Sequence, residues 1–258
     1  MTLAPSYTYP DQVPVALRQQ GYAVLSTLGT CELLNTAASD LAKLGESWSD
    51  LPADAHLKDG GRYRHRRHGC FIVDRDSVQL VAHRAHWQPV EYNALHGGMQ
   101  RWFEPILPQT LALPAWNKLL LSLAAQSSVL FAEQPWFVEA HQFRIDTEGG
   151  IGRPTPEGAH RDGVELVAVF LVNRHGIKGG ETRVFDAHGT RGERFTLTQP
   201  WSLVLLDDAR VIHESTPIQP IANQGDVSAY RDTLVVTCRA GGFQSFIPVL
   251  TQPKTVAD

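Results

Sequence analysis

The sequence predicts an α+β protein in which a jelly-roll core of short strands carries N-terminal helices packed on one face. About eight short β-rich runs follow Phe137, separated by Gly, Pro, Asn and Asp, and this close spacing is typical of two-sheet jelly rolls rather than βαβ folds. Helical periodicity is confined to about the first 135 residues. Because we find no internal repeat or low-complexity linker, we expect one domain over residues 1–258, mainly helical in 1–135, with the jelly-roll core in 136–250.

Two segments of the N-terminal part have one apolar face at helical spacing. Thr30 is suited to cap the first segment, which carries Leu33, Leu34, Ala37, Leu41 and Leu44. The second segment follows Pro114 and repeats the pattern in Trp116, Leu119, Leu120, Leu123 and Ser127. Residues 21–25 (GYAVL) form a short strand candidate. Because each helix must bury its apolar stripe, we expect both to pack against the roll.

The strand candidates of the second part are short and contain many β-branched residues. They are FVEAHQFRI (137–145), VELVAVFLV (164–172), ETRVF (181–185), RFTL (194–197), WSLVLL (201–206), RVIH (210–213), TLVVTC (233–238) and FQSFIPV (243–249). Turns are expected at Gly179–Gly180 and at Asp207–Asp208.

Composition excludes several classes of protein. Hydrophobic residues make up 43% and charged residues 19% of the chain, which excludes wholesale disorder, and a net charge of −4 argues against a nucleic-acid partner. The three cysteines, Cys31, Cys70 and Cys238, are scattered without a CxxC motif, which argues against a disulfide scaffold or a structural zinc site. We find no signal peptide and no apolar stretch of membrane-spanning length, so we expect a cytoplasmic protein with no membrane partner.

The first candidate site is His160-Arg161-Asp162, at the start of an expected strand. Residues i and i+2 of a strand point to the same side, so His160 and Asp162 converge. His213 lies at the end of another β-rich run. Two histidines and one carboxylate are the facial triad of non-haem Fe(II) oxygenases, which leaves the other coordination positions open. The alternative is that both histidines lie in the core and are satisfied by backbone groups.

Arg231 and Thr233 form a second candidate site, on one side of the strand RDTLVVT. A guanidinium can hold a carboxylate through two hydrogen bonds. A dicarboxylic 2-oxo acid could therefore be anchored here while its other end chelates iron. The alternative is an ion pair between Arg231 and a surface carboxylate such as Asp232 or Glu214.

Longer blocks of the sequence carry a resemblance to a known family. These blocks are GRYRHRRHG (61–69), HQFRID (141–146), PTPEGAHRDGVELVAVFLVNRHGIKGGET (154–182), IHESTPI (212–218) and YRDTLVVT (230–237). Over about residues 15–240, the chain resembles the bacterial 2-oxoglutarate and Fe(II) dependent dioxygenases that include free L-amino-acid hydroxylases of the isoleucine 4-hydroxylase type. Some relatives in that family are named only as biofilm, stress and motility proteins. The block 154–182 is the longest and most specific.

The resemblance implies a double-stranded β-helix of the cupin-like kind and the cofactors Fe(II), 2-oxoglutarate and O2. It implies three metal ligands, which would also be the catalytic centre: His160, Asp162 and His213. It further implies that Arg231 binds the distal carboxylate of 2-oxoglutarate, that Thr233 is a second contact to it, and that Gln142 forms part of the cosubstrate wall. The family chemistry converts 2-oxoglutarate to succinate and CO2 while an unactivated carbon is hydroxylated; the iron performs the difficult step and the protein orients the groups.

The remaining histidines are expected to be structural. His141 is expected to pack, because a fourth protein ligand would close the metal site. Five others are expected at the surface or in loops: His65, His68, His83, His86 and His96. The basic segment 60–71 contains four arginines and is either a solvated loop, the commoner case, or an anion-binding mouth.

The predicted function is hydroxylation or sulfoxidation of a free L-amino acid, a small-molecule substrate. Its carboxylate needs an arginine and its ammonium needs acidic or carbonyl acceptors. The candidates are Arg64, Arg66, Arg67 and Glu157. The alternatives are a dioxygenase acting on a peptide or a modified amino acid, and a non-catalytic or regulatory jelly-roll protein linked to stress or biofilm. A zinc-dependent cupin is disfavoured because we find no HxH motif. A homo-oligomer is left open.

Overall fold

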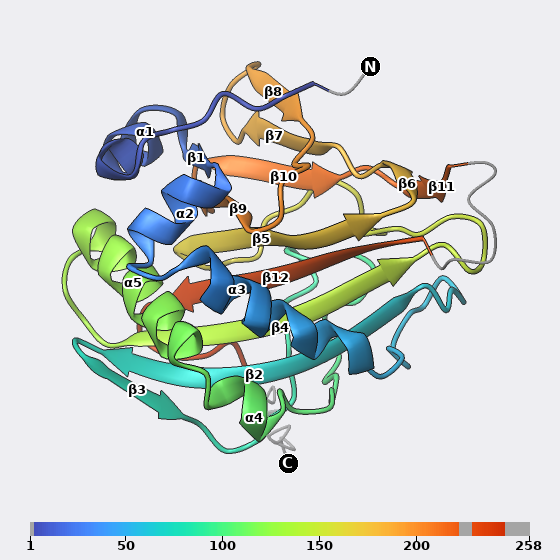
Figure 1. The fold of residues 1–258 in the computed structure, drawn as a ribbon, viewed down its shortest axis with the longest axis horizontal. Helices are drawn as coiled ribbons and strands as arrows, with labels where there is room; N and C mark the ends of the chain where they lie inside the picture. Colours follow the sequence, from blue (N-terminus) through green and yellow to red (C-terminus); the bar gives the residue numbers. More distant parts are fainter. Residues whose placement is uncertain (1–2, 222–228, 246–258) are drawn as a thin grey trace, which may run out of the picture.

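A seven-stranded antiparallel sheet forms the centre of the molecule in the computed structural model, which describes residues 3–221 and 229–245. Its strand order is β1-β9-β5-β12-β4-β2-β3, and a three-stranded sheet (β10-β7-β8) and a two-stranded sheet (β11-β6) complete the roll (Figure 1). The strands are β1 (Tyr22–Leu25), β2 (Arg64–Asp74), β3 (Ser77–Leu80), β4 (Trp136–Asp146), β5 (Leu166–His175), β6 (Ile177–Gly179), β7 (Thr182–Asp186), β8 (Gly192–Phe195), β9 (Ser202–Asp207), β10 (Val211–Ser215), β11 (Ile218–Pro220) and β12 (Tyr230–Arg239). This architecture confirms the predicted α+β jelly roll.

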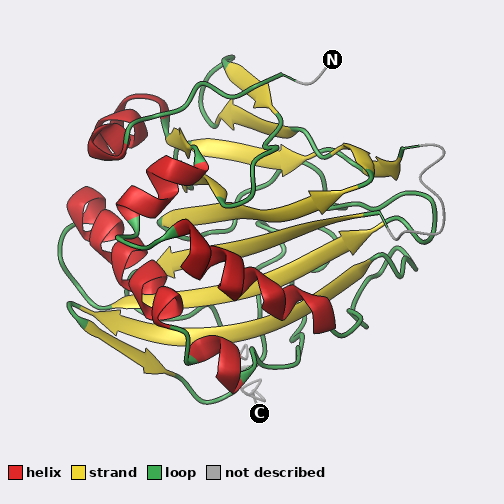
Figure 2. Cartoon of the chain, in the orientation of Figure 1, coloured by secondary structure: helices red, strands yellow, loops and turns green. Residues whose placement is uncertain are grey.

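Helices cover one face of the large sheet (Figure 2). They are α1 (Val13–Gln20), α2 (Thr27–Leu33), α3 (Ala38–Gly45), α4 (Pro108–Leu111) and α5 (Pro114–Phe131), with short 3-10 helices η1 (Pro10–Gln12) and η2 (Glu46–Asp50). Helix α5 confirms the expected helix after Pro114, which is its first residue and provides a φ angle suited to helix initiation. No helix in the described part of the chain has the length and apolar character needed to cross a membrane.

The two faces of the large sheet have different environments. Side chains of the sheet and of the helices meet between the two layers and form the main core, which includes Trp48, Phe71, Trp116 and Phe170. Side chains that point into the roll form a smaller apolar cluster around β5 and β9. On the inner face of β2, β4 and β12 the residues are mostly polar. The interior of the roll is therefore apolar on one side and charged on the other.

The first predicted helix is in fact two helices. The N-cap is Ser26, whose Oγ accepts a hydrogen bond from the Gly29 backbone N–H at 3.2 Å, and Thr30 is buried inside α2 rather than capping it. The chain then breaks at Asn35, which has a positive φ of 46°, before α3 begins. The short polar side chain of asparagine tolerates this left-handed conformation.

The basic segment is a strand and not a loop. From Arg64 onward it belongs to β2, which pairs with β4 from Arg64↔Ile145 to Val73↔Trp136. Three of the seven strands of the large sheet, β1, β2 and β3, thus precede residue 136, so the N-terminal part is not simply helical. The last expected strand, 243–249, has no regular structure at residues 243–245, and the rest of it lies outside the described residues.

Candidate metal centre

His160, Asp162 and His213 converge at one end of the roll. His213 lies on β10, and His160 pairs with it through two backbone hydrogen bonds of 3.0 Å, which places the two imidazoles side by side. Asp162 Oδ1 lies 3.9 Å from His160 Nε2, and Asp162 Oδ2 lies 3.8 Å from His213 Nε2. One ligand atom from each of the three residues lies within 4.8 Å of the others. Two imidazole nitrogens and one carboxylate oxygen so arranged suit a divalent transition metal and leave half of an octahedral shell open.

Neighbouring groups orient two of these side chains. The His160 Nδ1–H donates to the Gly158 carbonyl oxygen at 3.0 Å, so Nε2 is the nitrogen free to ligate. Gln88 Nε2 donates to Asp162 Oδ1 at 3.1 Å. A carbonyl acceptor behind a ligating histidine and a donor on the ligating carboxylate are typical supports of metal centres.

Asp208, expected only to mark a turn, anchors the loop that carries Asp162. Its carboxylate is fully buried and accepts backbone hydrogen bonds from Asp162 at 2.9 Å, Gly163 at 2.7 Å and Val164 at 3.2 Å. Gly163 has a positive φ of 75°, a conformation that favours glycine. The Asp208 side chain therefore fixes the backbone from which the Asp162 carboxylate projects.

We expect Asp208→Asn to weaken Fe(II) binding by about 10- to 100-fold, as is usual when a group supporting a metal ligand is lost. The Asn side chain has only one acceptor oxygen for the three N–H groups. Excess Fe(II) should restore full occupancy of the site, because the three candidate ligands themselves remain. Anaerobic titration calorimetry measures the affinity, and Asp207→Asn is the matched control. Equal Fe(II) affinities for the two variants would contradict this role.

The two histidines differ in how readily they are protonated. Burial, with a contribution from His160, lowers the pKa of His213 to about 3, so its imidazole is neutral at physiological pH. Burial also lowers the pKa of His160, but the carboxylates of Asp162 and Glu157 outweigh it and raise that pKa above its usual value. Of the two candidate ligands, His160 is therefore the one at which protons would compete with a metal ion.

We expect metal affinity to fall as the pH falls below the pKa of His160, which lies above the usual 6.5 or so. Because one imidazole must lose one proton to bind, the apparent Kd should rise about tenfold per pH unit in that range, rather than a hundredfold. Titration with Fe(II) under argon between pH 8 and pH 5 measures the slope. A flat affinity would contradict histidine ligation, and a slope of two would show that His213 is also protonated.

Arg231 and Thr233 lie deeper along the same inner face. Both lie on the same face of β12 as Val235. Val235 lines the cavity at the candidate metal centre, but Arg231 and Thr233 do not. Arg231 is 3% exposed, and its Cδ lies 3.4 Å from where a Cβ on Gly180 would stand. No side-chain hydrogen bond or ion pair of Arg231 is found among residues 3–221 and 229–245. Burial and the nearby Arg174 lower its pKa to about 10, and the carboxylate of Asp232, which pairs with Arg144, opposes this shift only in part.

The prediction that Gln142 forms part of the cosubstrate wall is wrong. Its neighbours His141 and Phe143 face the cavity, so strand alternation turns Gln142 to the helical side. There Gln142 is fully buried and donates to Ser47 Oγ at 2.8 Å. Its role is to tie β4 to η2.

The cavity at the metal centre has a volume of about 130 Å³ and charges of both signs on its wall. Arg64 and Arg66 of β2 line it, as do Arg101, Glu139 and Glu157. Each of the three arginines has a buried nitrogen without a hydrogen-bond partner among the described residues: Nη2 of Arg64, Nε of Arg66 and Nε of Arg101. Arg67 points to the other face of the sheet, where it donates to the backbone oxygens of Asp50 and Pro105.

The structure places several histidines and two residues of the cavity wall differently from the sequence-based expectation. His68, His86 and His96 are buried rather than at the surface, and His141 lines the cavity. His65 is half-buried beside Asp146, and His83 is exposed. Arg101 and Gln88 come from a segment without regular structure, so no local pattern marks them. Strand alternation could have found Glu139 and His141, which share a face of one strand.

Comparisons with known proteins identify relatives of this chain. The sequence profile of the family described as 2OG-Fe dioxygenase matches residues 45–237. The crystal structure of a bsmA homologue from Methylobium petroleophilum PM1 is 51% identical, covers 94% of this chain and 97% of its own, and gives a TM-score of 0.88. A search of the curated proteins found no match.

Two more distant structures share the fold. IDO from Bacillus thuringiensis is 17% identical over 92% of this chain and 100% of its own, with a TM-score of 0.71. The Fe(II)/α-ketoglutarate-dependent dioxygenase TqaL is 18% identical over 93% of this chain and 91% of its own, with a TM-score of 0.64.

Proposed function

Because the chain belongs to the 2OG-Fe(II) dioxygenase family, which uses Fe(II), 2-oxoglutarate and O2, we propose that it hydroxylates or sulfoxidises a free L-amino acid. In this proposal His160, Asp162 and His213 hold the metal. The donor set supports it: two imidazoles whose Nε2 atoms face one carboxylate within metal-ligand reach. When bound, the iron supplies the oxidative chemistry, with succinate and CO2 released from 2-oxoglutarate.

The chain's own residues would place the cosubstrate. The buried guanidinium of Arg231 suits the distal carboxylate of 2-oxoglutarate, because an anion would offset a charge that no described residue pairs. Thr233, one step nearer the metal on the same face, would add a hydroxyl donor. Val235 continues this line to the cavity.

The observation that carries the substrate class is the mixed charge of the cavity wall. A zwitterion needs both a cationic and an anionic partner out of water, and unpaired buried groups are costly. Arg101 Nη2 donates to Gln88 Oε1 at 3.0 Å, and Gln88 in turn donates to Asp162, so this guanidinium lies next to the metal ligands. Its unpaired Nε suits the substrate carboxylate, while Glu139 and Glu157 offer acceptors for the ammonium.

The test is a turnover assay with the twenty free L-amino acids. The protein is loaded with Fe(II) under argon and given 2-oxoglutarate and O2, and succinate is quantified with each amino acid. We expect one or a few to raise succinate well above the uncoupled rate and to gain one oxygen atom in mass. If none does while 2-oxoglutarate still binds, the substrate is a peptide or a modified amino acid; if 2-oxoglutarate does not bind, the regulatory alternative replaces the enzyme.

We also propose a cytoplasmic location. Cys31, Cys70 and Cys238 are all free thiols in the structure. Unpaired cysteines are usual in a reducing compartment.

A further inference from the structure

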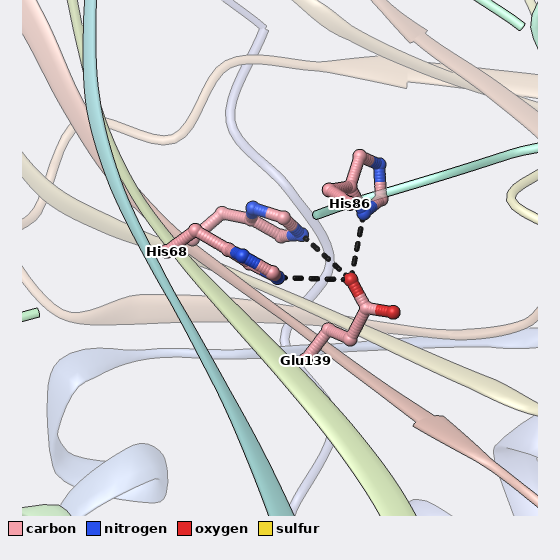
Figure 3. A group of neighbouring side chains, drawn as sticks. His68, His86 and Glu139 are labelled. Carbon is pink, nitrogen blue, oxygen red and sulfur yellow. Dashed lines mark hydrogen bonds and ion pairs between the residues drawn. The ribbon is translucent and has the colours of Figure 1, made fainter. Parts of the chain in front are cut away.

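Three histidines surround one carboxylate oxygen of Glu139 (Figure 3). Glu139 Oε2 lies 2.9 Å from His68 Nε2 and 2.6 Å from His86 Nδ1, and 3.8 Å from His141 Nε2. Glu139 and His141 lie on the same face of β4, and His68 lies directly opposite His141 on β2. All four side chains are buried. The cluster is separate from the metal centre, but Glu139, His86 and His141 line the same cavity.

The hydrogen bonds fix where the protons lie. A carboxylate only accepts, so the facing nitrogens of His68 and His86 carry hydrogen. Arg66 Nη2 donates to His141 Nδ1 at 2.6 Å, and a guanidinium only donates, so the His141 hydrogen is on Nε2, toward Glu139. Burial would raise the pKa of Glu139, but His86 and His68 outweigh it and hold that pKa well below its usual range. Glu139 is therefore an anion.

The same geometry argues against a second metal ion here. A ligating histidine normally donates its other N–H to an acceptor, whereas the other nitrogen of His141 faces a guanidinium. With Nε2 protonated, His141 has no lone pair to offer a metal ion. Arg66 and Arg101 also contribute positive charge at His141, which disfavours a bound cation with two charges.

The second oxygen of Glu139 is free to accept. Every hydrogen bond or ion pair of this carboxylate with the described residues uses Oε2, and Figure 3 shows Oε1 turned away from the labelled histidines. A buried carboxylate with half of its acceptor capacity unused suits a small cation with several N–H donors. Glu157 also lies on the wall, but its Oε1 is 3.7 Å from His160 Nε2, which places this side chain beside the candidate metal centre; its Oε2 has no partner among the described residues and is a second acceptor there.

We propose that Glu139 Oε1 binds the ammonium group of the substrate, and that His68, His86 and His141 are positioning residues that hold the other oxygen. This inference rests on the proposed function and deepens it, because it names the residue that distinguishes an amino acid from the hydroxy acid of the same skeleton. Arg101, on the same cavity wall, would take the carboxylate.

The test compares wild type with Glu139→Gln on matched probes. Each L-amino acid that supports turnover is assayed beside its 2-hydroxy acid, which lacks only the ammonium. We expect Glu139→Gln to raise the KM of the amino acid at least about thirtyfold, the usual effect of removing one partner of a buried charge pair. The preference for amino acid over hydroxy acid should collapse, while the KM for 2-oxoglutarate stays unchanged. Glu133→Gln, at an exposed glutamate, is the matched control.

The positioning role is tested at His86. An Asn side chain can present an N–H near the place of His86 Nδ1, and a Leu side chain cannot. We therefore expect His86→Asn to keep the preference for the amino acid over its 2-hydroxy acid, and His86→Leu to lose it. A purely structural role would change stability in both variants without changing the preference between the two probes.

The outcomes separate this inference from the proposed function. If amino acids are oxidised and Glu139→Gln keeps both KM and preference, Glu139 is not the ammonium site and the inference is overturned. If no amino acid is oxidised, titration calorimetry of n-butylammonium into the Fe(II)·2-oxoglutarate form decides. Binding that Glu139→Gln abolishes supports the ammonium site, and no binding overturns it. Two metal ions per wild-type chain, but one in Glu139→Gln, would also overturn it in favour of a second metal site.

Discussion

Asp162→Ala is expected to lose Fe(II) binding and to form succinate more than about a hundredfold more slowly than wild type. Changing a group that merely supports a metal ligand costs about 10- to 100-fold, so losing the only carboxylate of the triad should cost more. His213→Ala should behave alike. Anaerobic titration with Fe(II) and a succinate assay at saturating 2-oxoglutarate measure the two effects.

Asp76→Ala, which removes an exposed aspartate from the turn between β2 and β3, is the control for Asp162→Ala. It should bind Fe(II) as wild type does. Succinate formation at the wild-type rate by Asp162→Ala would show that the metal is held elsewhere.

The second large effect is expected for Arg231→Ala, in the binding of 2-oxoglutarate. Removing one partner of a buried, hydrogen-bonded charge pair costs about 2–5 kcal/mol, or roughly 30- to several-thousandfold in KM. Because the buried guanidinium has no ion-pair partner among the described residues, and Asp232 offsets its charge only in part, the variant lacking 2-oxoglutarate should be at least as stable as wild type. Arg231→Ala should thus lower the affinity for 2-oxoglutarate without lowering the thermal stability of the protein that lacks it.

Arg231→Lys is the matched variant, since it keeps the charge but not the planar fork, and it should recover part of the affinity. Thermal melting with and without 2-oxoglutarate provides the second measurement. If Arg231→Ala melts at a lower temperature than wild type but keeps the wild-type KM for 2-oxoglutarate, Arg231 has a structural role instead.

Much of the fold could be predicted because the strands of the second part are apolar on at least one face. For this reason the sequence pattern predicts strands at β4, β5, β9 and β12. Strand β2 was missed because charged residues occupy both of its faces around Arg64 to His68, which hides the period of two. Burial of these charges depends on Asp54, whose carboxylate lies 2.7 Å from Arg64 Nε, and this contact crosses from another segment.

The spacing of two between His160 and Asp162 drew attention to the right segment, but not for the expected reason. The two residues precede β5, which begins at Leu166, and their positions depend on the bridge between His160 and His213 and on the loop that Asp208 anchors. Arg101 and Gln88 could not be found, because they reach the cavity from irregular chain held by tertiary contacts. For Gln142 the alternation within β4 was available from the sequence and gives the correct face once His141 is placed inside.

The two-faced strands have a consequence for how this protein can diverge over generations. On β4 and β12 one row of side chains, such as Val138, Ala140 and Leu234, packs with the helices, while the alternate row faces the cavity. Side chains on opposite faces of a strand do not share packing partners, and such positions change stability nearly additively, so inward residues can be exchanged with the helical contacts left intact. Descendants of one ancestor could therefore acquire new substrate preferences through mutations on the inner row while inheriting the same folded scaffold.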